Sequence, residues 1–326
     1  MVKFLVIRFS SIGDIVLTTP VIRNLKSQIE GAEIHYLTKK AFLPVIQDNP
    51  YIHKIHLYDN NLQEIIKDLK RIDFDFIIDL HNNLRSSRIK LALNKVSYSF
   101  PKLNIEKWLL VNLKINKLPD VHIVDRYMST LSLFNIKNDG RGLDFFISAD
   151  NEMNTRLLPE AFQKGYISVV IGAKHNTKQL PLSRIIELIE KLKFPVLLLG
   201  GKDDAERGDS ISSAVGENCI NLCGKLSIQQ SASYLKQSKM VISHDTGLMH
   251  IASAFGKTIL SIWGNTIPEF GMHPYMPGDN SEIFEVKIKC RPCSKIGFEK
   301  CPIKHFNCMN QIDLDAIATK TKQVLS

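Results

Sequence analysis

The chain alternates short apolar runs with stretches in which apolar side chains recur at helical spacing. The runs predict strands at 4–7, 34–37, 55–58, 74–79, 167–171, 196–199, 240–243 and 258–262. Helical spacing predicts helices at 62–69, 122–134, 185–192, 226–235, 246–255 and 312–325, and another along 15–25, with Asp14 where a helix N-cap belongs. Strands that are apolar on both faces and alternate with helices are typical of parallel sheets covered by helices on both sides.

This alternation of strands and helices occurs twice along the chain, and the pattern weakens at two places. Between Ser99 and Asn116 the pattern suggests an inserted segment, and the polar stretch 135–142 leads towards a linker. A chain of 326 residues is also long for one core, because domains cluster near ~100–150 residues. We therefore expect two doubly wound, Rossmann-like α/β domains with a cleft between them. Their bounds are predicted at 1–160 and 161–310, with a terminal helix over 311–326 that could cross back to the first domain.

The composition is that of a folded, soluble protein. Apolar residues make up 44% and charged residues 23% of the chain, which argues against disorder. No window holds the ~18–20 apolar residues of a membrane span, and the first apolar run is too short for a signal peptide. We expect a cytoplasmic protein.

The net charge of +9 points to an anionic partner such as a phosphate or a membrane surface. The alternative is a basic protein without such a partner, which charge alone does not exclude. The basic residues are scattered and accompany no nucleic-acid-binding motif, so nucleic acid is not expected as a partner.

The segment Ser243–His250 joins a predicted strand to a predicted helix. Free backbone N–H groups and the helix dipole make such a junction an anion site. Gly247 permits close backbone approach, the hydroxyl of Thr246 can donate, and His250 falls on the same helical face as Thr246. The alternative is that Asp245 or Thr246 only caps the helix and that His250 is a core histidine.

Two further loops follow strands in the second half. The loop 172–181 contains Lys174 and Lys178, which could neutralise a leaving diphosphate or could be solvated surface lysines. The loop 200–206 ends in Glu206, which could accept hydrogen bonds from sugar hydroxyls or could simply start a helix.

In the first half, the turn 10–14 and the segment 79–88 each follow a strand. Asp14 could act as a general base or as a helix cap. Arg85 and Arg88 could bind acidic groups of an acceptor, or could be surface residues at a helix start. Asp73 and Asp75 form an Asp-x-Asp sequence, but Asp75 falls in a strand pattern and is interpreted as structural.

Two segments together resemble the lipopolysaccharide heptosyltransferases of glycosyltransferase family 9. They are the opening Arg8-Phe9-Ser10-Ser11-Ile12-Gly13-Asp14 through Pro20, and Asp245-Thr246-Gly247-Leu248-Met249-His250. Lys178-Gln179-Leu180-Pro181 and the cysteine-containing tail to Met309 are also similar to that family, although Leu180 stands where the family usually has Trp.

The resemblance implies a GT-B fold and inverting transfer, without a metal or other cofactor, from ADP-heptose or a related nucleotide sugar. It implies Asp14 as the base and Lys178 as the lysine at the leaving group. It implies Asp245, Thr246, Gly247, Leu248 and His250 as donor-binding residues, and Glu206 fits the family pattern only loosely. Ser10, Ser11, Gly13 and Lys174 are further residues expected to bind the donor. The implied acceptor is an anionic glycolipid, so Trp108 and nearby basic residues could touch a membrane surface.

Three other functions remain open at this stage. A sugar-nucleotide epimerase would need no acceptor surface, and a non-catalytic module would bind a nucleotide sugar without turnover. A nicotinamide-dependent dehydrogenase is disfavoured because the turn 10–13 has one glycine where the dinucleotide motif needs three.

Four of the six cysteines, Cys290, Cys293, Cys301 and Cys308, lie within nineteen residues. Four thiols with one Cys-x-x-Cys pair could hold a structural zinc ion. Reduced, packed thiols are the alternative, since the second half is not such a pair and His305 adds another candidate ligand.

Overall fold

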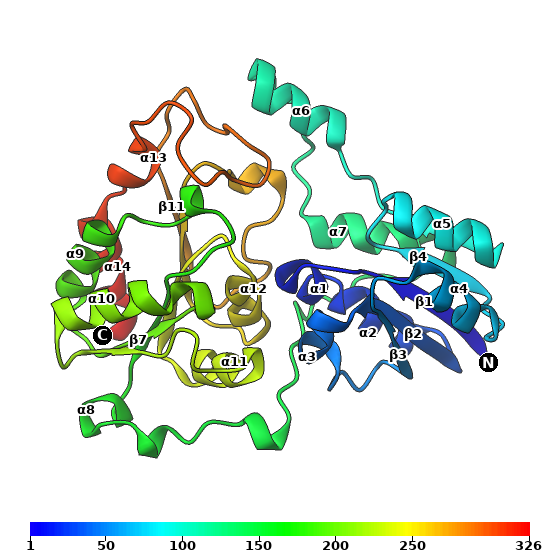
Figure 1. Ribbon diagram of the computed structural model, residues 1–326, viewed down its shortest axis with the longest axis horizontal. Helices are drawn as coiled ribbons and strands as arrows, with labels where there is room; N and C mark the ends of the chain where they lie inside the picture. The colour runs from blue at the N-terminus through cyan, green and yellow to red at the C-terminus, as the bar shows by residue number, and fades with distance from the viewer. The chain divides into compact units, whose positions relative to one another are not determined.

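The computed structural model describes residues 1–326, which divide into two compact units. The first unit comprises 1–103 and 121–146, and the second comprises 104–120 and 147–326. Each unit is built on one parallel sheet with helices on both faces (Figure 1). None of the helices combines the length and apolar character that crossing a membrane requires.

The first unit carries a five-stranded sheet in the order β3-β2-β1-β4-β5. Its strands are β1 (Val2–Ile7), β2 (Ala32–Lys39), β3 (Lys54–Tyr58), β4 (Phe76–Asp79) and β5 (Val96–Ser99). Its helices are α1 (Ile12–Val16), α2 (Thr19–Gln28), α3 (Leu43–Ile46), α4 (Leu62–Lys70), α5 (Leu84–Leu93) and α7 (Ile123–Met128), with short 3-10 turns η1 (Lys40–Phe42) and η2 (Ser129–Phe134). Side chains of β1 at Leu5 and Ile7 pack with apolar residues of α4 and α5 in one buried cluster.

The second unit carries a six-stranded sheet in the order β11-β10-β9-β6-β7-β8. Its strands are β6 (Ile167–Val170), β7 (Val196–Leu199), β8 (Cys219–Asn221), β9 (Met240–His244), β10 (Ile259–Trp263) and β11 (Glu282–Glu285). Its longer helices are α6 (Asn104–Leu113), α9 (Leu182–Leu192), α10 (Ala205–Val215), α11 (Ile228–Gln237), α12 (Gly247–Ala254) and α14 (Leu314–Leu325). Its short elements are α8 (Glu160–Gln163), α13 (Asn307–Asn310), η3 (Ala149–Asn151), η4 (Thr155–Leu157), η5 (Asn176–Lys178), η6 (Lys202–Asp204) and η7 (Pro268–Phe270).

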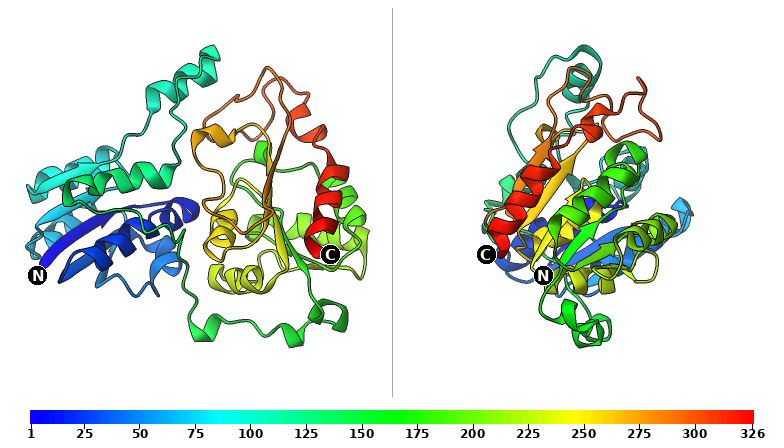
Figure 2. Two further views of the ribbon diagram at one scale, coloured as in Figure 1. Left: turned by 180° about the vertical axis from the view of Figure 1, so that it is seen from behind. Right: turned by 90° about the vertical axis from the view of Figure 1, so that its left-hand side faces the viewer.

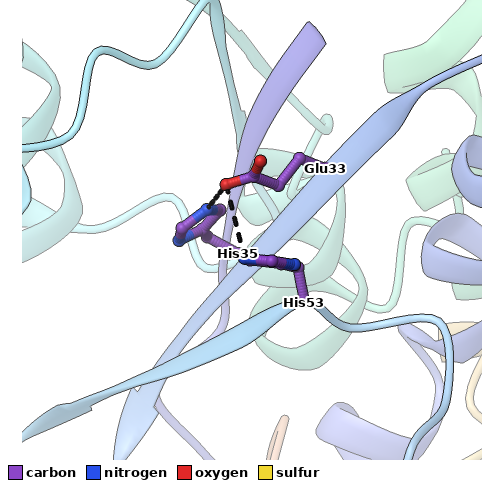
Figure 3. Close-up of side chains that lie close together, drawn as sticks. All are labelled: Glu33, His35 and His53. Atoms are coloured by element: carbon purple, nitrogen blue, oxygen red, sulfur yellow. Dashed lines mark hydrogen bonds and ion pairs between the residues drawn. The ribbon is translucent and has the colours of Figure 1, made fainter. Parts of the chain in front are cut away.

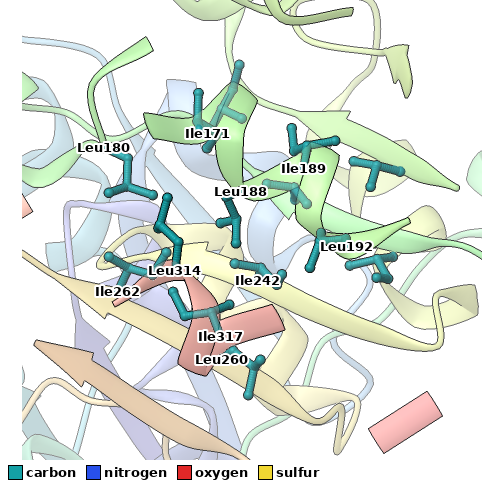
Figure 4. Close-up of a cluster of buried hydrophobic side chains, with 14 of the residues drawn as sticks. Ile171, Leu180, Leu188, Ile189, Leu192, Ile242, Leu260, Ile262, Leu314 and Ile317 are labelled. Carbon is teal, nitrogen blue, oxygen red and sulfur yellow. The ribbon is translucent and has the colours of Figure 1, made fainter. Parts of the chain in front are cut away.

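The main core of the second unit lies between one face of this sheet and helices α9 and α14. Alternate residues of a strand face the same side of a sheet, so Ile242 of β9 and Leu260 and Ile262 of β10 meet Leu188 and Ile317 from these helices (Figure 4). Figures 1 and 2 show α14 alongside α9. The last helix therefore belongs to the second unit, whereas the sequence left open a return to the first.

The predicted fold class, α/β with two doubly wound parallel sheets, is confirmed. Counted from the start of each unit, both sheets follow the order 3-2-1-4-5, with a sixth strand in the second, which is the order of Rossmann-like domains. The sequence did not predict β5, β8 and β11. All three are edge strands of three or four residues, and β5 and β11 are largely exposed, so they lack the apolar run of a buried strand.

Two other features differ from the sequence prediction. The single helix expected along 15–25 is divided into α1 and α2, with Pro20 in the first turn of α2, where a missing N–H costs nothing. The inserted segment, expected inside the first domain, groups with the second unit because Leu110 of α6 packs with Ile267 and Phe270. The chain passes between the units at 103/104, 120/121 and 146/147, and not at the predicted 160/161.

Candidate functional site

In each unit, strand order reverses beside the first strand, and ligands of such sheets bind at the carboxyl ends of the two strands that flank this point. In the first unit these strands are β1 and β4, and in the second they are β6 and β9. Asp14 follows β1 and His81 follows β4, while Lys178 follows β6 and Asp245 follows β9. The main candidate residues thus lie at the two positions where this fold binds ligands.

Asp14 lies in the first turn of α1, three residues after the N-cap, which is Ser11. The prediction that Asp14 is the N-cap is therefore wrong by three positions. One carboxylate oxygen, Oδ2, accepts hydrogen bonds from the backbone N–H of Ser11 at 3.1 Å and from its hydroxyl at 2.7 Å. The other oxygen, Oδ1, lies 2.6 Å from Nη2 of Arg8, and the side chain of Asp14 remains 22% exposed. The carboxylate is held in place and still reaches solvent.

Arg8 is fixed by three further hydrogen bonds. Its guanidinium donates to the carbonyl oxygens of Ser10 at 2.7 Å and Leu80 at 2.5 Å, and to the hydroxyl of Tyr127 at 2.9 Å. Burial alone would lower the pKa of Arg8. The interactions of Arg8 with Asp14 and with nearby tyrosines together exceed this effect, so the pKa of Arg8 is raised. A permanently charged arginine favours the ionised form of Asp14, which is the form that can accept a proton.

His81 belongs to the same cluster, and the sequence analysis did not single it out. Its backbone N–H donates to Asp79 Oδ1 at 3.0 Å, and its ring meets that of Phe9 edge to face. Burial lowers the pKa of His81 to about 4, aided by the charges of Arg8 and Lys102, so the ring is neutral at pH 7. Its buried Nδ1 has no protein partner, which makes it available to a bound hydroxyl.

Arg85 and Arg88 lie in the first two turns of α5. The guanidinium of Arg85 lies 5.4 Å from the ring centre of Phe9 and 4.8 Å from that of Tyr58. This stacking holds Arg85 beside Phe9, the residue after Arg8. Arg88 is exposed on the surface of α5. Stacked arginine keeps its edge N–H groups for an anionic ligand, so acceptor binding by Arg85 stays a prediction with a physical basis.

In the second unit, Lys178 and Asp245 form an ion pair. Lys178 Nζ lies 2.5 Å from Asp245 Oδ2, and the same oxygen accepts a hydrogen bond from the Thr266 hydroxyl at 3.0 Å. Both charged side chains are largely buried, at 15% and 12% exposure. An ammonium group has three N–H donors, so the pair leaves Lys178 two donors for another ligand.

The helix that follows, α12, has Thr246 as its N-cap, and the side chain of Thr246 makes no capping hydrogen bond. Thr246 and Gly247 are half-buried, while Leu248 and His250 are buried. The first backbone N–H groups of a helix lack partners within it, and its dipole is positive there. The predicted anion site at Asp245–Leu248 therefore has the donors that it needs.

Two residues that the sequence analysis missed support the loop of Lys178. His244 Nε2 accepts a hydrogen bond from the N–H of Leu180 at 3.0 Å, and burial lowers the pKa of His244 to about 3, so it is a neutral acceptor. Arg207 of α10 donates to the side chain of Gln179 and to the carbonyl oxygen of Leu180. No local sequence signal marks these roles, because the partners are at least 27 residues apart. Leu180, in place of the family's usual Trp, is itself buried in the core.

The remaining predicted donor residues are less constrained. Lys174 and Glu206 are exposed, Glu206 in the first turn of α10. Ser10 and Gly13 lie beside Asp14 in the first unit, Ser10 half-buried and Gly13 buried. A further candidate is Asn265, which follows β10, is 1% exposed and has no protein partner for either amide atom. A buried amide of this kind is usually satisfied by water or a ligand.

The acids of the Asp-x-Asp sequence lie before β4, away from the strand end that carries His81. Asp75 accepts from the backbone N–H of Lys3 at 2.7 Å, and Asp73 pairs with Lys95 at 2.6 Å. Both acids are thus engaged in local contacts of the sheet.

The four clustered cysteines are free thiols, as are the other two. Burial raises the pKa of Cys293, and raises that of Cys308 to about 12, which keeps both protonated at pH 7. The one group of three histidine, cysteine or acidic residues whose ligand atoms are gathered closely enough to share an ion lies elsewhere, at Glu33, His35 and His53. Binding of zinc by the cysteines stays a prediction.

Two Rossmann-like domains, each with candidate ligand groups at its switch point, have the GT-B architecture. The family model of glycosyltransferase family 9 (heptosyltransferase) matches residues 62–303, and the chain belongs to this family. The resemblance described above is thereby confirmed, and the protein is a glycosyltransferase.

Individual relatives are distant in sequence but similar over most of their length. The chain is 22% identical to lipopolysaccharide heptosyltransferase 1 of Campylobacter coli over 81% of this chain and 84% of the relative. It resembles a solved family 9 glycosyltransferase from Veillonella parvula with a TM-score of 0.80 and 19% identity, covering 99% of this chain and 97% of the other. The solved E. coli ADP-heptose LPS heptosyltransferase II gives a TM-score of 0.75 and 18% identity, covering 99% and 98%.

Proposed function

We propose that the protein is an inverting heptosyltransferase that transfers heptose from ADP-heptose to an anionic acceptor of the lipopolysaccharide core, without a metal ion. Family membership and the names of the relatives support the sugar and the acceptor class. The observation that carries the mechanism is the placement of Asp14, paired with Arg8, at one switch point and of the Lys178–Asp245 pair beside a helix N-terminus at the other.

In this mechanism Asp14 accepts the proton of an acceptor hydroxyl. The hydroxyl oxygen forms a bond to the anomeric carbon while the bond from that carbon to the diphosphate oxygen breaks, and its electron pair stays on the diphosphate. Attack from the face opposite the leaving group inverts the anomeric centre. His81, neutral and without a partner at Nδ1, is suited to orient the acceptor hydroxyl.

The leaving diphosphate gains negative charge as the bond breaks. Lys178 offers two N–H donors beyond its bond to Asp245, and the N-terminus of α12 offers backbone N–H groups. Groups of this kind are worth roughly 3 kcal/mol each when they face developing charge. These cationic and dipolar groups are the basis for proposing that no divalent ion is needed.

Arg85 is proposed to bind an acidic group of the acceptor, with Arg88 on the next turn. We further propose that α6 touches the membrane surface. Its Ile105 is 73% and its Trp108 51% exposed, and Lys295 lies beside the start of this helix, where its Nζ is 3.4 Å from the carbonyl oxygen of Asn104. Exposed apolar and basic side chains together suit the interface of an anionic membrane.

The test compares wild type with Asp14→Asn by ADP release from ADP-heptose, with and without a deacylated core acceptor. We expect acceptor-dependent release to fall by about 10²–10⁴-fold in the variant, the range for loss of a general base. Affinity for ADP-heptose, measured by calorimetry, should stay within about threefold. Asp73→Asn makes the same chemical change at an exposed acid outside the switch point and should leave turnover unchanged.

Each other outcome has a defined meaning. Turnover retained in Asp14→Asn would remove Asp14 from the role of base. Binding of ADP-heptose without turnover in the wild type would identify a binding module, and no binding would mean another nucleotide sugar. Retention of the anomeric configuration, read by NMR of the product, would contradict inversion, and loss of activity in EDTA that added Mg²⁺ restores would contradict metal independence.

A further inference from the structure

Glu33, His35 and His53 form a cluster in the first unit that the transfer reaction does not use. Glu33 and His35 lie two residues apart on β2, so they share one face of the sheet, and His53 immediately precedes β3 (Figure 3). One ligand atom from each residue lies within 4.8 Å of the other two. Glu33 Oε1 is 2.7 Å from His35 Nε2 and 3.6 Å from His53 Nε2.

A fourth residue, His56 of β3, supports the orientation of His35. His35 Nδ1 lies 2.8 Å from His56 Nε2, and the ring of Phe74 packs edge-on against His35. Histidines that bind metals almost always use one ring nitrogen for the ion and donate the other N–H to a neighbouring group. The bond to His56 therefore fixes His35 with Nε2 directed to Glu33, on the side where His53 also lies.

We propose that Glu33, His35 and His53 bind a divalent transition-metal ion, with His56 as the hydrogen-bonding support of His35. Two imidazoles and one carboxylate suit Zn²⁺, Co²⁺ or Ni²⁺, with water completing the coordination. Ca²⁺ and Mg²⁺ require mostly oxygen ligands and do not fit a set with a single carboxylate.

The position of the cluster gives the ion a structural role. Glu33 pairs with Lys3 near the start of β1, whereas Asp14 follows the far end of that strand. Ile7 lies four residues beyond Lys3 on β1, roughly 13 Å along the strand at ~3.3 Å per residue. The ion would join the entry of the edge strand β3 to β2, and this inference does not rest on the proposed transferase activity.

The experiment uses the full chain, stripped with a chelator and titrated with Co²⁺ and then Zn²⁺. Wild type should bind one Co²⁺ with the visible absorption of nitrogen and oxygen ligation, and Zn²⁺ should displace it and raise Tm. His53→Gln should weaken this binding at least 100-fold and abolish the rise in Tm. This variant should fold, since the His53 side chain is 59% exposed.

His305→Gln is the matched control, because His305 is also exposed but lies near Cys290, with Nε2 3.8 Å from the sulfur. This variant should bind Co²⁺ at Glu33, His35 and His53 as wild type does. Thiolate ligation adds intense near-ultraviolet bands, so binding by the cysteines is recognised separately. The proposal fails if Co²⁺ does not bind, or if all bound Co²⁺ shows the thiolate bands. It also fails if His53→Gln binds Co²⁺ as tightly as wild type does.

Discussion

Gly264, directly after β10, allows the backbone of Thr177 to approach closely because it has no side chain. A Cβ at this residue would lie 2.6 Å from the carbonyl oxygen of Thr177 and 2.5 Å from Cε of Met309. Met309 has a flexible end that can move, but the Thr177 backbone can move only together with its neighbour Lys178. The close approach thus links the loop after β10 to the residue proposed to face the leaving group.

Gly264→Ala should lower kcat/KM about 10–100-fold while the protein stays folded, because displacements near 1 Å at reacting groups have effects of this size. ADP-release kinetics and a thermal melt check both parts. Adding Met309→Leu removes the methionine methyl group but not the contact with Thr177, so it should not restore activity. Restored activity in the double variant would locate the crowding at Met309 instead.

At the level of single residues, the sequence predicted those that follow strands and belong to recognisable turns. Asp14, Lys178 and Asp245 are of this kind, and their contacts are now defined. His81, Arg207 and Asn265 were not foreseen because their significance depends on burial and on neighbours far along the chain. Even for Asp14 the local role was misjudged, since either Ser11 or Asp14 has the chemistry of an N-cap.

Among the elements, α10 has a specific connection to the loop of Lys178 through Arg207. Burial lowers the pKa of Arg207, yet the residue remains charged and binds both Gln179 and Leu180. Its removal would leave the carbonyl oxygen of Leu180 without this donor. Arg207 is thus a positioning residue for Lys178.

Arg207→Met should lower kcat about tenfold or more with a smaller change in KM, because donor groups elsewhere on α12 remain. It should also destabilise the fold by about 1–3 kcal/mol, the usual cost of a buried group left without its partner. Steady-state kinetics and urea unfolding measure the two effects. Arg207→Lys keeps a charge and part of the bonding, and should recover part of kcat. Unchanged kcat in Arg207→Met would show that the loop is held without Arg207.

The elements that sequence reasoning found and missed differ in burial. Central strands such as β1, β6 and β9 are apolar on both faces and were predicted within one or two residues. The edge strands β5 and β11 expose most of their side chains, so their sequences do not differ from those of loops. The switch points nevertheless depend only on central strands, and this is why a candidate site could be predicted at them from sequence.

At the scale of the whole molecule, acid stability should depend on Arg23, which is 1% exposed and binds Asp139 and Asp144. The hydrogen bond from Arg23 lowers the pKa of Asp139 to about 2, against ~3.9 in an unfolded chain. Because the pKa of Asp139 is lower in the folded protein, ionised Asp139 stabilises the fold at pH values above its unfolded pKa. This contribution to the free energy of unfolding is lost as pH falls from about 4 to 2. Burial raises the pKa of Asp144, so that residue acts in the opposite direction.

Asp139→Asn should therefore destabilise the protein by about 1 kcal/mol at pH 7, allowing for solvent screening, and the difference from wild type should vanish near pH 2. Urea unfolding between pH 2 and 7 measures this. Asp68→Asn removes an exposed acid paired with Arg71 and should have little effect at any pH. A difference between Asp139→Asn and wild type that does not change with pH would contradict the assigned ion pair.

The division of the chain between the two units could be predicted only in outline. Two repeats of the same strand and helix rhythm are visible in the sequence, and they correspond to the two sheets. The grouping of α6 with the second unit depends on Leu110 meeting Ile267 and Phe270, and on Lys114 donating to the carbonyl oxygens of Cys290 and Pro292. Contacts over more than 150 residues leave no local pattern.

Because α6 belongs to the second unit, it cannot complete its packing until later parts of the chain have been synthesised. Leu110 leaves the ribosome before Ile267 and Phe270 exist, and at ~5–20 residues per second the wait for about 150 further residues is roughly 10–30 seconds. During that time the first unit can assemble, because its five strands precede α6 and its helix α7 follows soon after, while α6 itself stays without its partners. The nascent chain thus carries α6 with Leu110 uncovered, as a target for chaperones until the second half of the protein has been made.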